Sequence, residues 1–219
     1  MGTGPNFPKE VEKSHLVVAI PTTGRMTTVR WGFNLALQDY PLSMSNNFLV
    51  VRGAEAGEAR NRIAEQVLAI KSKLVWMLDD DVLPPQYAVQ KLMFAMLNKP
   101  DVMACAGIVY TKSELPSPLV FGNDGAGPYY NWKKGKAFEV PGFISTGCML
   151  IRSEVFEKVE YPWFKTIDYP DKMTEDAYFC MKVIKAGYKI LGHGGVLCGH
   201  YDGRTRRIFG APKQELVTA

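Results

Sequence analysis

The sequence predicts an α/β fold in which a mostly parallel central sheet is flanked by helices. Short apolar runs alternate with segments of helical periodicity from about residue 15 to residue 110, and such alternation produces parallel strands joined by right-handed crossovers. The runs 16–20 and 74–78 are unbroken, as expected for strands buried on both faces. Prolines, glycines and aromatic residues cluster between residues 111 and 140, so we expect a small inserted layer of loops or short strands there.

Composition narrows the class of protein. With 219 residues, of which 47% are hydrophobic, the chain can bury a substantial core as one domain. The net charge of +4 is mild and mixed along the chain, which gives little reason to expect nucleic acid as a partner. Four scattered cysteines predict reduced core residues of a cytoplasmic protein. Residues 1–14 do not resemble a signal peptide, and no apolar run is long enough to cross a bilayer.

The first two predicted strands end in loops that suit a ligand. The strand at 16–20 runs into a loop with a glycine and small hydroxyl residues, which allow a ligand to approach closely. That loop consists of Pro21, Thr22, Thr23, Gly24 and Arg25. A helix through residues 31–37 is expected next, followed by a strand at 47–51 that ends at Arg52 and Gly53.

A basic residue lies on the apolar side of the next helix. Ile63, Val67 and Ile70 mark the apolar stripe, and Arg60 falls on it, three residues before Ile63. Because the helix follows a strand, its first turns lie at the carboxyl edge of the sheet, and Arg60 should point towards Asp79–Asp81. The alternative is an arginine that extends past the core into solvent. Arg62 is expected to pair with Glu58 at i,i+4 spacing on the surface.

Three consecutive carboxylates follow the buried strand at 74–78. Asp79, Asp80 and Asp81 repel one another, so folding alone gives no reason to place them together. Ligands of open α/β sheets bind at this carboxyl edge, and a divalent cation that carries nucleotide phosphates would neutralise the charge. If the backbone stays extended, Asp79 and Asp81 point the same way and Asp80 points the opposite way. The alternative is a solvated acidic turn.

Further helices and strands are predicted up to residue 152. Pro84 and Pro85 open a helix that places residues 92, 95 and 96 against the core, and residues 101–110 form a strand. In the inserted layer, Tyr129, Tyr130 and Trp132 can stack on a sugar ring or pack the loop against the body. Residues 142–152 return to a strand pattern with a small-residue break at 145–148, where a glycine lets another group approach.

The last part of the chain carries a second acidic pair. After a short helix from residue 153, Thr174 is expected to cap a helix that begins with Glu175 and Asp176 and ends at residues 186–187. Strands at 188–191 and 196–198 lead to His200. Arg204, Arg206 and Arg207 follow as a local basic run.

Together these residues resemble glycosyltransferases of the GT-A fold, closest to the family 2-like enzymes. The resemblance spans the chain from the first strand to His200. It rests on the opening strand and loop at 19–22, the arginine-bearing helix at 59–62, the DxD at Asp79–Asp81, and the late acidic pair followed by a histidine. Arg52 and Gly53 stand where many members carry an acidic residue that reads the base, which leaves the base open.

The resemblance implies a metal-dependent transfer from a nucleotide-sugar donor. Mn2+ or Mg2+ would stabilise the leaving diphosphate as a Lewis acid. Asp81 would be the principal metal ligand and Asp79 would bind metal or ribose. His200 would complete the coordination, with His193 as a competitor for that role. The donor-binding set comprises Pro21, Thr22, Thr23, Arg25, Arg52, Arg60, Asp79, Asp80 and Arg204.

The resemblance also implies a base and a closing segment. Asp176 would take the acceptor hydroxyl proton and Glu175 would position hydroxyl groups. The helix dipole alone also favours carboxylates in this first turn. The tail with Arg204 would close over the diphosphate. The expected parts of the single domain are a nucleotide-binding half at about 15–110, an acceptor and catalytic half at about 111–200, and a flexible basic tail at 201–219.

The predicted function is therefore inverting glycosyl transfer to a carbohydrate, lipid-linked or protein acceptor, with a peripheral membrane contact compatible with the sequence. One alternative is a sugar-phosphate nucleotidyltransferase, although the loop at 21–25 is a poor version of the glycine-rich loop such enzymes carry. Another alternative is a non-catalytic nucleotide- or carbohydrate-binding module on the same fold. The sequence leaves the donor sugar, the acceptor and the oligomeric state open.

Overall fold

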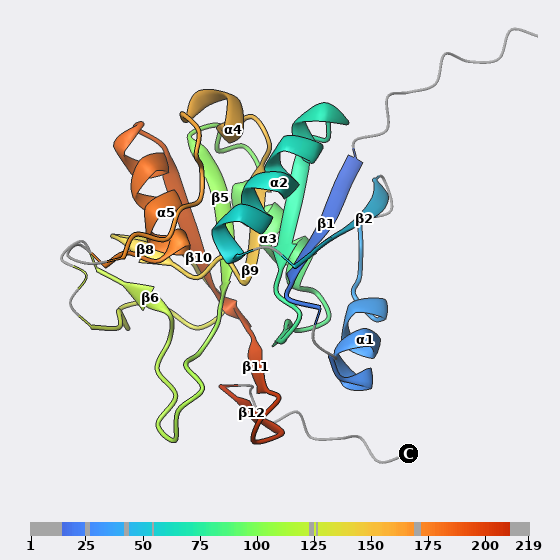
Figure 1. Cartoon of the computed structure of the whole chain (residues 1–219). Coiled ribbons are helices and arrows are strands. Elements are labelled where there is room, and N and C mark those ends of the chain that lie inside the picture. Colours follow the sequence, from blue (N-terminus) through green and yellow to red (C-terminus); the bar gives the residue numbers. More distant parts are fainter. Residues whose placement is uncertain are drawn as a thin grey trace, which may run out of the picture.

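A computed structural model describes residues 15–24, 27–41, 44–53, 55–122, 125, 127–168 and 172–210. A seven-stranded mixed sheet forms its centre, in the order β2-β1-β3-β9-β5-β10-β7 (Figure 1). Five strands run parallel to one another: β1 (His15–Thr22), β2 (Ser45–Arg52), β3 (Leu74–Leu78), β5 (Val102–Ile108) and β10 (Lys189–Leu197). Two run against them: β9 (Cys148–Arg152), between β3 and β5, and β7 (Ala137–Glu139), at the edge. The predicted mostly parallel sheet is confirmed.

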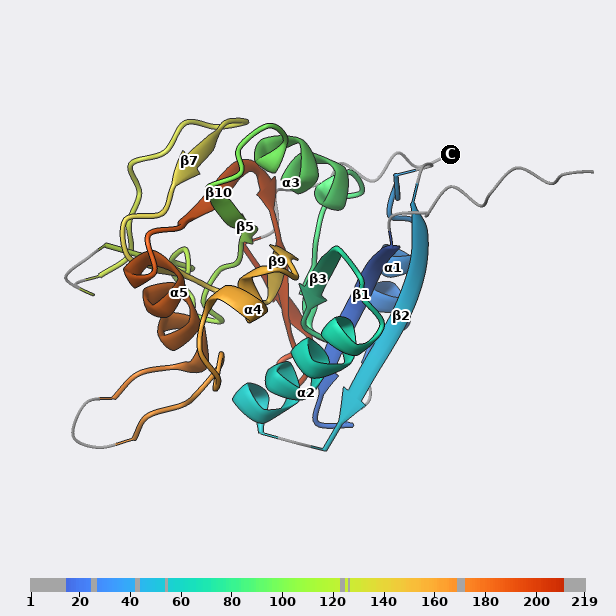
Figure 2. The same ribbon diagram turned by 90° about the horizontal axis from the view of Figure 1, so that it is seen from above.

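Helices cover both faces of this sheet. Figure 2 shows α3 (Ala88–Met96) on one side and α2 (Ala56–Ala69), α4 (Val155–Lys158) and α5 (Glu175–Lys185) on the other. Alternate residues of β1 enter two separate cores. Val17 packs with α2 and α5, whereas Val18 packs with α3 and with Trp31 of α1 (Val29–Ala36). This burial on both faces explains why the runs at 16–20 and 74–78 are unbroken and apolar.

Two small sheets lie beside the central one. The inserted layer contains β6 (Val120–Phe121), which pairs with β8 (Phe143–Ile144), and its last strand, β7, joins the central sheet. A three-stranded sheet has the order β12-β11-β4 and consists of β4 (Val82–Leu83), β11 (Gly199–Asp202) and β12 (Arg207–Phe209). Residues 201–210, which the sequence assigns to a flexible tail, thus form a hairpin anchored on the segment after the aspartates.

One predicted core residue is exposed, and two aromatic residues of the inserted layer adopt one of the two roles expected for them. Ile70 caps α2 and is 52% exposed, so its assignment to the apolar stripe was wrong. Trp132 stacks on Phe138 with ring centroids 5.4 Å apart, and both pack against the core together with Tyr129. The packing role is therefore the one that the structure shows for Tyr129 and Trp132, while Tyr130 stays 60% exposed.

All four cysteines are free and buried, as the sequence predicts. Within the described ranges, none of the helices combines the length and the apolar character that a membrane span requires.

Candidate active site

A cavity of about 200 Å³ opens at the carboxyl ends of β1 and β3. The first turns of α2 and α5 form its opposite wall, so residues from both ends of the chain meet here. Residues that line it are Pro21, Thr22, Thr23, Ala56, Ala59, Arg60, Asp79, Asp80, Asp81, Glu175 and His200. This edge is where open α/β sheets bind their ligands.

The three aspartates form a tight turn. The backbone N–H of Val82 donates to the Asp79 carbonyl at 3.1 Å, so the extended backbone that would align Asp79 and Asp81 is absent at this place. Each carboxylate has a different partner instead. Asp79 pairs with Arg60 at 2.8 Å, Asp80 accepts the Thr22 hydroxyl at 2.5 Å, and Asp81 pairs with Lys112 at 2.6 Å.

Three other segments fix the backbone of this turn. The Trp31 indole N–H donates to the Asp79 carbonyl at 3.1 Å, and the Thr27 hydroxyl donates to the Asp80 carbonyl at 2.7 Å. The N–H of Tyr201 in β11 donates to the Asp81 carbonyl at 2.7 Å. The N–H of Asp79 donates to the Gly147 carbonyl at 3.0 Å. Because its backbone groups are satisfied, the turn presents its carboxylates in a fixed arrangement.

Arg60 connects the aspartate turn to the late acidic pair. Its side chain is only 3% exposed and lies 2.8 Å from Asp79, 3.7 Å from Glu175 and 4.0 Å from Asp176. The predicted orientation of Arg60 towards the aspartates is therefore what the structure shows. Its Nε also donates to the buried Thr146 hydroxyl at 2.8 Å, and that hydroxyl donates to Asp176.

Glu175 and Asp176 begin α5, where the Thr174 side chain caps the helix as predicted by accepting the N–H of Ala177. Burial and the neighbouring Asp176 carboxylate raise the pKa of Glu175, although Arg60 opposes that change. Glu175 lines the cavity. Asp176 lies behind it, with one carboxylate oxygen held by Thr146, and is not among the lining residues.

On the other side of the cavity, Asp81 faces an imidazole and an ammonium group. His200 Nε2 lies 3.5 Å from Asp81 Oδ1, and Lys112 Nζ contacts the other oxygen. Burial opposes ionisation of Asp81, but the neighbouring His200 and Lys112 side chains outweigh it and hold the pKa of this carboxyl well below its usual range. His200 Nδ1 lies 2.6 Å from the Tyr110 carbonyl. Since a carbonyl only accepts, Nδ1 carries the proton and Nε2 is directed at Asp81.

Asp81 and His200 suit a cation that arrives with other ligands of its own. Their donor atoms, a carboxylate oxygen and an imidazole nitrogen, suit Mn2+. The described residues contain no group of three or more His, Cys, Asp or Glu side chains arranged to hold a metal ion. Ions that carry nucleotide phosphates commonly use one or two protein carboxylates and fill their other positions with phosphate and water. A two-ligand site is consistent with such an ion, provided that Lys112 moves off Asp81.

A glycine provides the space that Asp79 occupies. A Cβ added to Gly147 would lie 2.9 Å from Asp79 Oδ2, closer than real Cβ contacts. Gly147 lies in the break just before β9, where the sequence predicts close approach of another group.

Not every predicted site residue reaches this cavity. Arg52 is exposed beside Gly24, and Arg204 is exposed in the β11–β12 turn; neither lines the cavity. Arg25 lies outside the described residues. His193 accepts the N–H of Gly195 and is absent from the lining, so His200 is the histidine that the structure places at the site.

Sequence reasoning missed Lys112 and Thr146. Lys112 lies in the proline-rich inserted segment and contacts an aspartate 31 positions away. Thr146 is buried 86 positions from its partner Arg60. The only signal for Thr146 was the small-residue break that contains it, and Lys112 had none.

Solved structures resemble this chain in fold. A197 from STIV is 19% identical, with a TM-score of 0.65 over 91% of this chain and 95% of that one. GalNAc-T7, crystallised with UDP, GalNAc and Mn2+, is 13% identical, with a TM-score of 0.61 over 87% of this chain and 44% of that one. TarS of S. aureus is 13% identical, with a TM-score of 0.50 over 83% of this chain and 36% of that one.

No family model matches the chain, and no curated protein sequence matches it. The structural likeness shows that the chain has the GT-A fold of glycosyltransferases that the sequence predicts. It gives no support for family 2 in particular.

Proposed function

We propose that this protein is a glycosyltransferase that moves a sugar from a nucleotide-sugar donor to an acceptor hydroxyl with a divalent cation. The observation that carries the proposal is the convergence of two acidic groups on one buried arginine. Asp79–Asp81 follow β3, Glu175 and Asp176 begin α5, and Arg60 joins them at the edge of the sheet. Structural stability alone does not require four carboxylates in the lining of one cavity and a fifth directly behind them.

The donor would bind at the loop after β1 and at the aspartate turn. Thr22 and Thr23 line the cavity beside Asp80, and the Thr22 hydroxyl already bonds to that carboxylate. Asp79 and Asp80 would hold hydroxyl groups of the donor, and Arg60 would orient the Asp79 carboxylate. Arg52 and Arg204 remain predicted donor contacts, which they could make only if their segments moved towards the diphosphate. Arg25 also remains a predicted donor contact and lies outside the described residues.

Asp81 and His200 would hold Mn2+ or Mg2+ between them. Bound there, the cation would supply Lewis-acid stabilisation of the leaving diphosphate. The Tyr110 carbonyl orients His200 as outer partners of ligating histidines do. Lys112 neutralises Asp81 until the cation arrives, and can then contact a phosphate oxygen.

Asp176 would accept the proton of the acceptor hydroxyl. Thr146 and Arg60 fix one of its oxygens, and the second oxygen has no hydrogen-bond partner among the described residues. Glu175, which faces the cavity, would position the hydroxyl group. Inversion of the anomeric centre follows if one base acts directly on the acceptor.

The test is a binding screen followed by an activity assay. Thermal unfolding is measured with a panel of nucleotide sugars, with and without Mn2+, because a ligand of the folded state raises its apparent stability. UDP-sugars come first, since the GalNAc-T7 structure contains UDP. Release of the nucleoside diphosphate then reports turnover.

Three variants separate the roles. Asp81→Asn is expected to lose the Mn2+-dependent stabilisation, whereas Asp176→Asn keeps donor binding and stops turnover. Asp101→Asn changes an exposed carboxylate that pairs with Lys189 at the amino-terminal ends of β5 and β10, and should keep both the Mn2+-dependent stabilisation and turnover. Full turnover by Asp176→Asn would refute the base assignment. Pyrophosphate release from a nucleoside triphosphate would favour a nucleotidyltransferase, and binding without any turnover would favour a non-catalytic module.

A further inference from the structure

Helix α1 exposes an apolar stripe. Val29, Phe33 and Leu37 are 76%, 63% and 63% exposed, and their four-residue spacing places them on one side of the helix. The opposite side carries Trp31, which is buried in the core beneath β3 and α3. The apolar side chains on the outer side of α1 are therefore not covered by the described residues. Arg30 is also exposed, and α1 contains no acidic residue.

The β11–β12 hairpin displays a basic cluster close by. Arg204, Arg206 and Arg207 are exposed in and after its turn, which the positive φ of Arg206 (58°) keeps tight. The acidic residue of the turn, Asp202, is engaged by the N–H of Arg204 and the hydroxyl of Thr205. The turn therefore offers its guanidinium groups to solvent while its carboxylate bonds to the turn itself.

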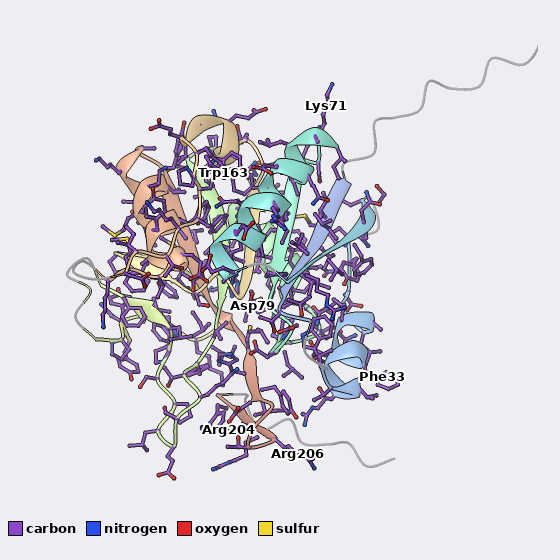
Figure 3. All side chains as sticks on the ribbon, viewed as in Figure 1. Phe33, Lys71, Asp79, Trp163, Arg204 and Arg206 are labelled. Carbon is purple, nitrogen blue, oxygen red and sulfur yellow. The ribbon has the colours of Figure 1, made fainter. Side chains whose placement is uncertain are left out.

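These features lie at one end of the molecule. Figure 1 shows α1, the β11–β12 hairpin and the long loop between β5 and β6 at the bottom, and Figure 3 places Phe33, Arg204 and Arg206 there. Leu115, in that loop, is 87% exposed. The five parallel strands of the central sheet have their carboxyl ends on this side of the molecule, so the site of the aspartates lies just above the hairpin in Figure 1. Glu114, an acidic residue, directly precedes Leu115 in the loop.

We propose that this end is a docking face for the surface of an anionic lipid bilayer. The docking face consists of Val29, Arg30, Phe33, Leu37, Leu115, Arg204, Arg206 and Arg207. Apolar side chains beside arginines match the boundary between acyl chains and anionic headgroups, and two such contributions together give stable binding where one alone is marginal. Docking would place the opening of the site next to lipid-borne acceptors.

A second copy of the chain is the less favoured occupant. A two-fold contact through this face would place the arginines of both copies in one interface, where their like charges repel. A bilayer with anionic headgroups supplies the opposite charge instead.

The test is co-sedimentation of the full chain with vesicles of phosphatidylcholine, with and without about one third phosphatidylglycerol. We expect binding to the anionic vesicles, and weaker binding as salt rises. Phe33→Glu should weaken partitioning about ten-fold or more, because an exposed aromatic side chain that would insert among the lipids is replaced by a charge. The matched control is Phe94→Glu on α3, at a residue that is 64% exposed on another part of the surface and should bind as the wild type does.

A second pair of variants tests the charge. Arg204→Glu/Arg206→Glu should lower binding at least about twenty-fold, since each arginine near an anionic surface contributes roughly five-fold. Lys133→Glu/Lys134→Glu changes the net charge equally on the inserted layer and should have a smaller effect. Absence of binding to anionic vesicles, equal effects of the two pairs, or a dimer in light scattering that Phe33→Glu dissociates would overturn the proposal. Circular dichroism confirms that each variant is folded.

Discussion

Replacement of Arg60 by methionine tests whether the acidic groups depend on one buried cation. Its guanidinium lies 2.8, 3.7 and 4.0 Å from the carboxylates of Asp79, Glu175 and Asp176. At an effective dielectric constant of about 20, the attraction between unit charges at such distances is roughly 4–6 kcal/mol per pair. Desolvation and repulsion among the carboxylates offset much of this, so truncating one partner of such a cluster should lower the free energy of unfolding by about 3–5 kcal/mol.

The loss should depend on pH in a defined direction. The pKa of Glu175 is already raised by burial and by Asp176, with Arg60 opposing, so removal of Arg60 raises it further. A carboxyl group whose pKa is raised in the folded state destabilises the protein when it is ionised. This destabilisation disappears as the pH falls towards about 4.3, the pKa of the group in the unfolded chain. The difference between wild type and Arg60→Met should therefore be largest near neutral pH and smaller in acid.

Urea denaturation at several pH values measures both effects. Arg62→Met is the matched control on the same helix, because Arg62 is 53% exposed and pairs with Glu58 at i,i+4 spacing, an arrangement worth at most about 0.5 kcal/mol. Adding Asp79→Asn to Arg60→Met should recover part of the loss. An Arg60→Met protein as stable as Arg62→Met, or one with a loss independent of pH, would refute the reasoning.

Three further predictions concern neighbouring positions. Thr146→Val leaves the Arg60 Nε and an Asp176 oxygen without their shared hydroxyl, and should lower the free energy of unfolding by about 1–3 kcal/mol in urea; an unchanged midpoint would contradict the bridge. Gly147→Ala puts a Cβ 2.9 Å from Asp79 Oδ2, and should reduce turnover roughly ten- to hundred-fold with the fold retained; wild-type turnover would show that Asp79 can shift freely. Burial and Lys91 lower the pKa of His193, whose Nδ1 accepts the Gly195 N–H at 3.0 Å. Protonation breaks that bond, so the wild type should lose stability relative to His193→Gln as pH falls below about 6.5, and parallel pH profiles of unfolding would exclude this.

Much of the fold could be predicted because its signals are local. The buried runs of β1 and β3, the stripe of α2 and the cap at Thr174 each depend on residues close in sequence. The direction of β9, by contrast, could not be predicted from local signals. Its apolar pattern predicts a strand, but only its pairing with β3 and β5 makes it antiparallel. The hairpin at 199–209 depends on a pairing with the two-residue strand β4, which has no periodicity of its own.

The residues of the candidate site also differ in whether the sequence alone could place them. Arg60 could be placed because helix periodicity and the position of the helix after a strand together fix its direction. The aspartate turn was located correctly, but its shape depends on bonds from Trp31, Thr27 and Tyr201, which come from two other segments, the start of α1 and β11. Lys112 reaches Asp81 from the inserted loop, and no pattern in that loop encodes the contact.

The most direct test of the central claim is anomalous diffraction at the manganese edge from crystals soaked with Mn2+ and UDP. A manganese peak between Asp81 and His200, with the diphosphate beside it and the Lys112 ammonium displaced from Asp81, is the predicted result. If manganese and nucleotide bind elsewhere, or if neither appears beside the aspartate turn while Lys112 stays in place, the proposed transferase site is contradicted.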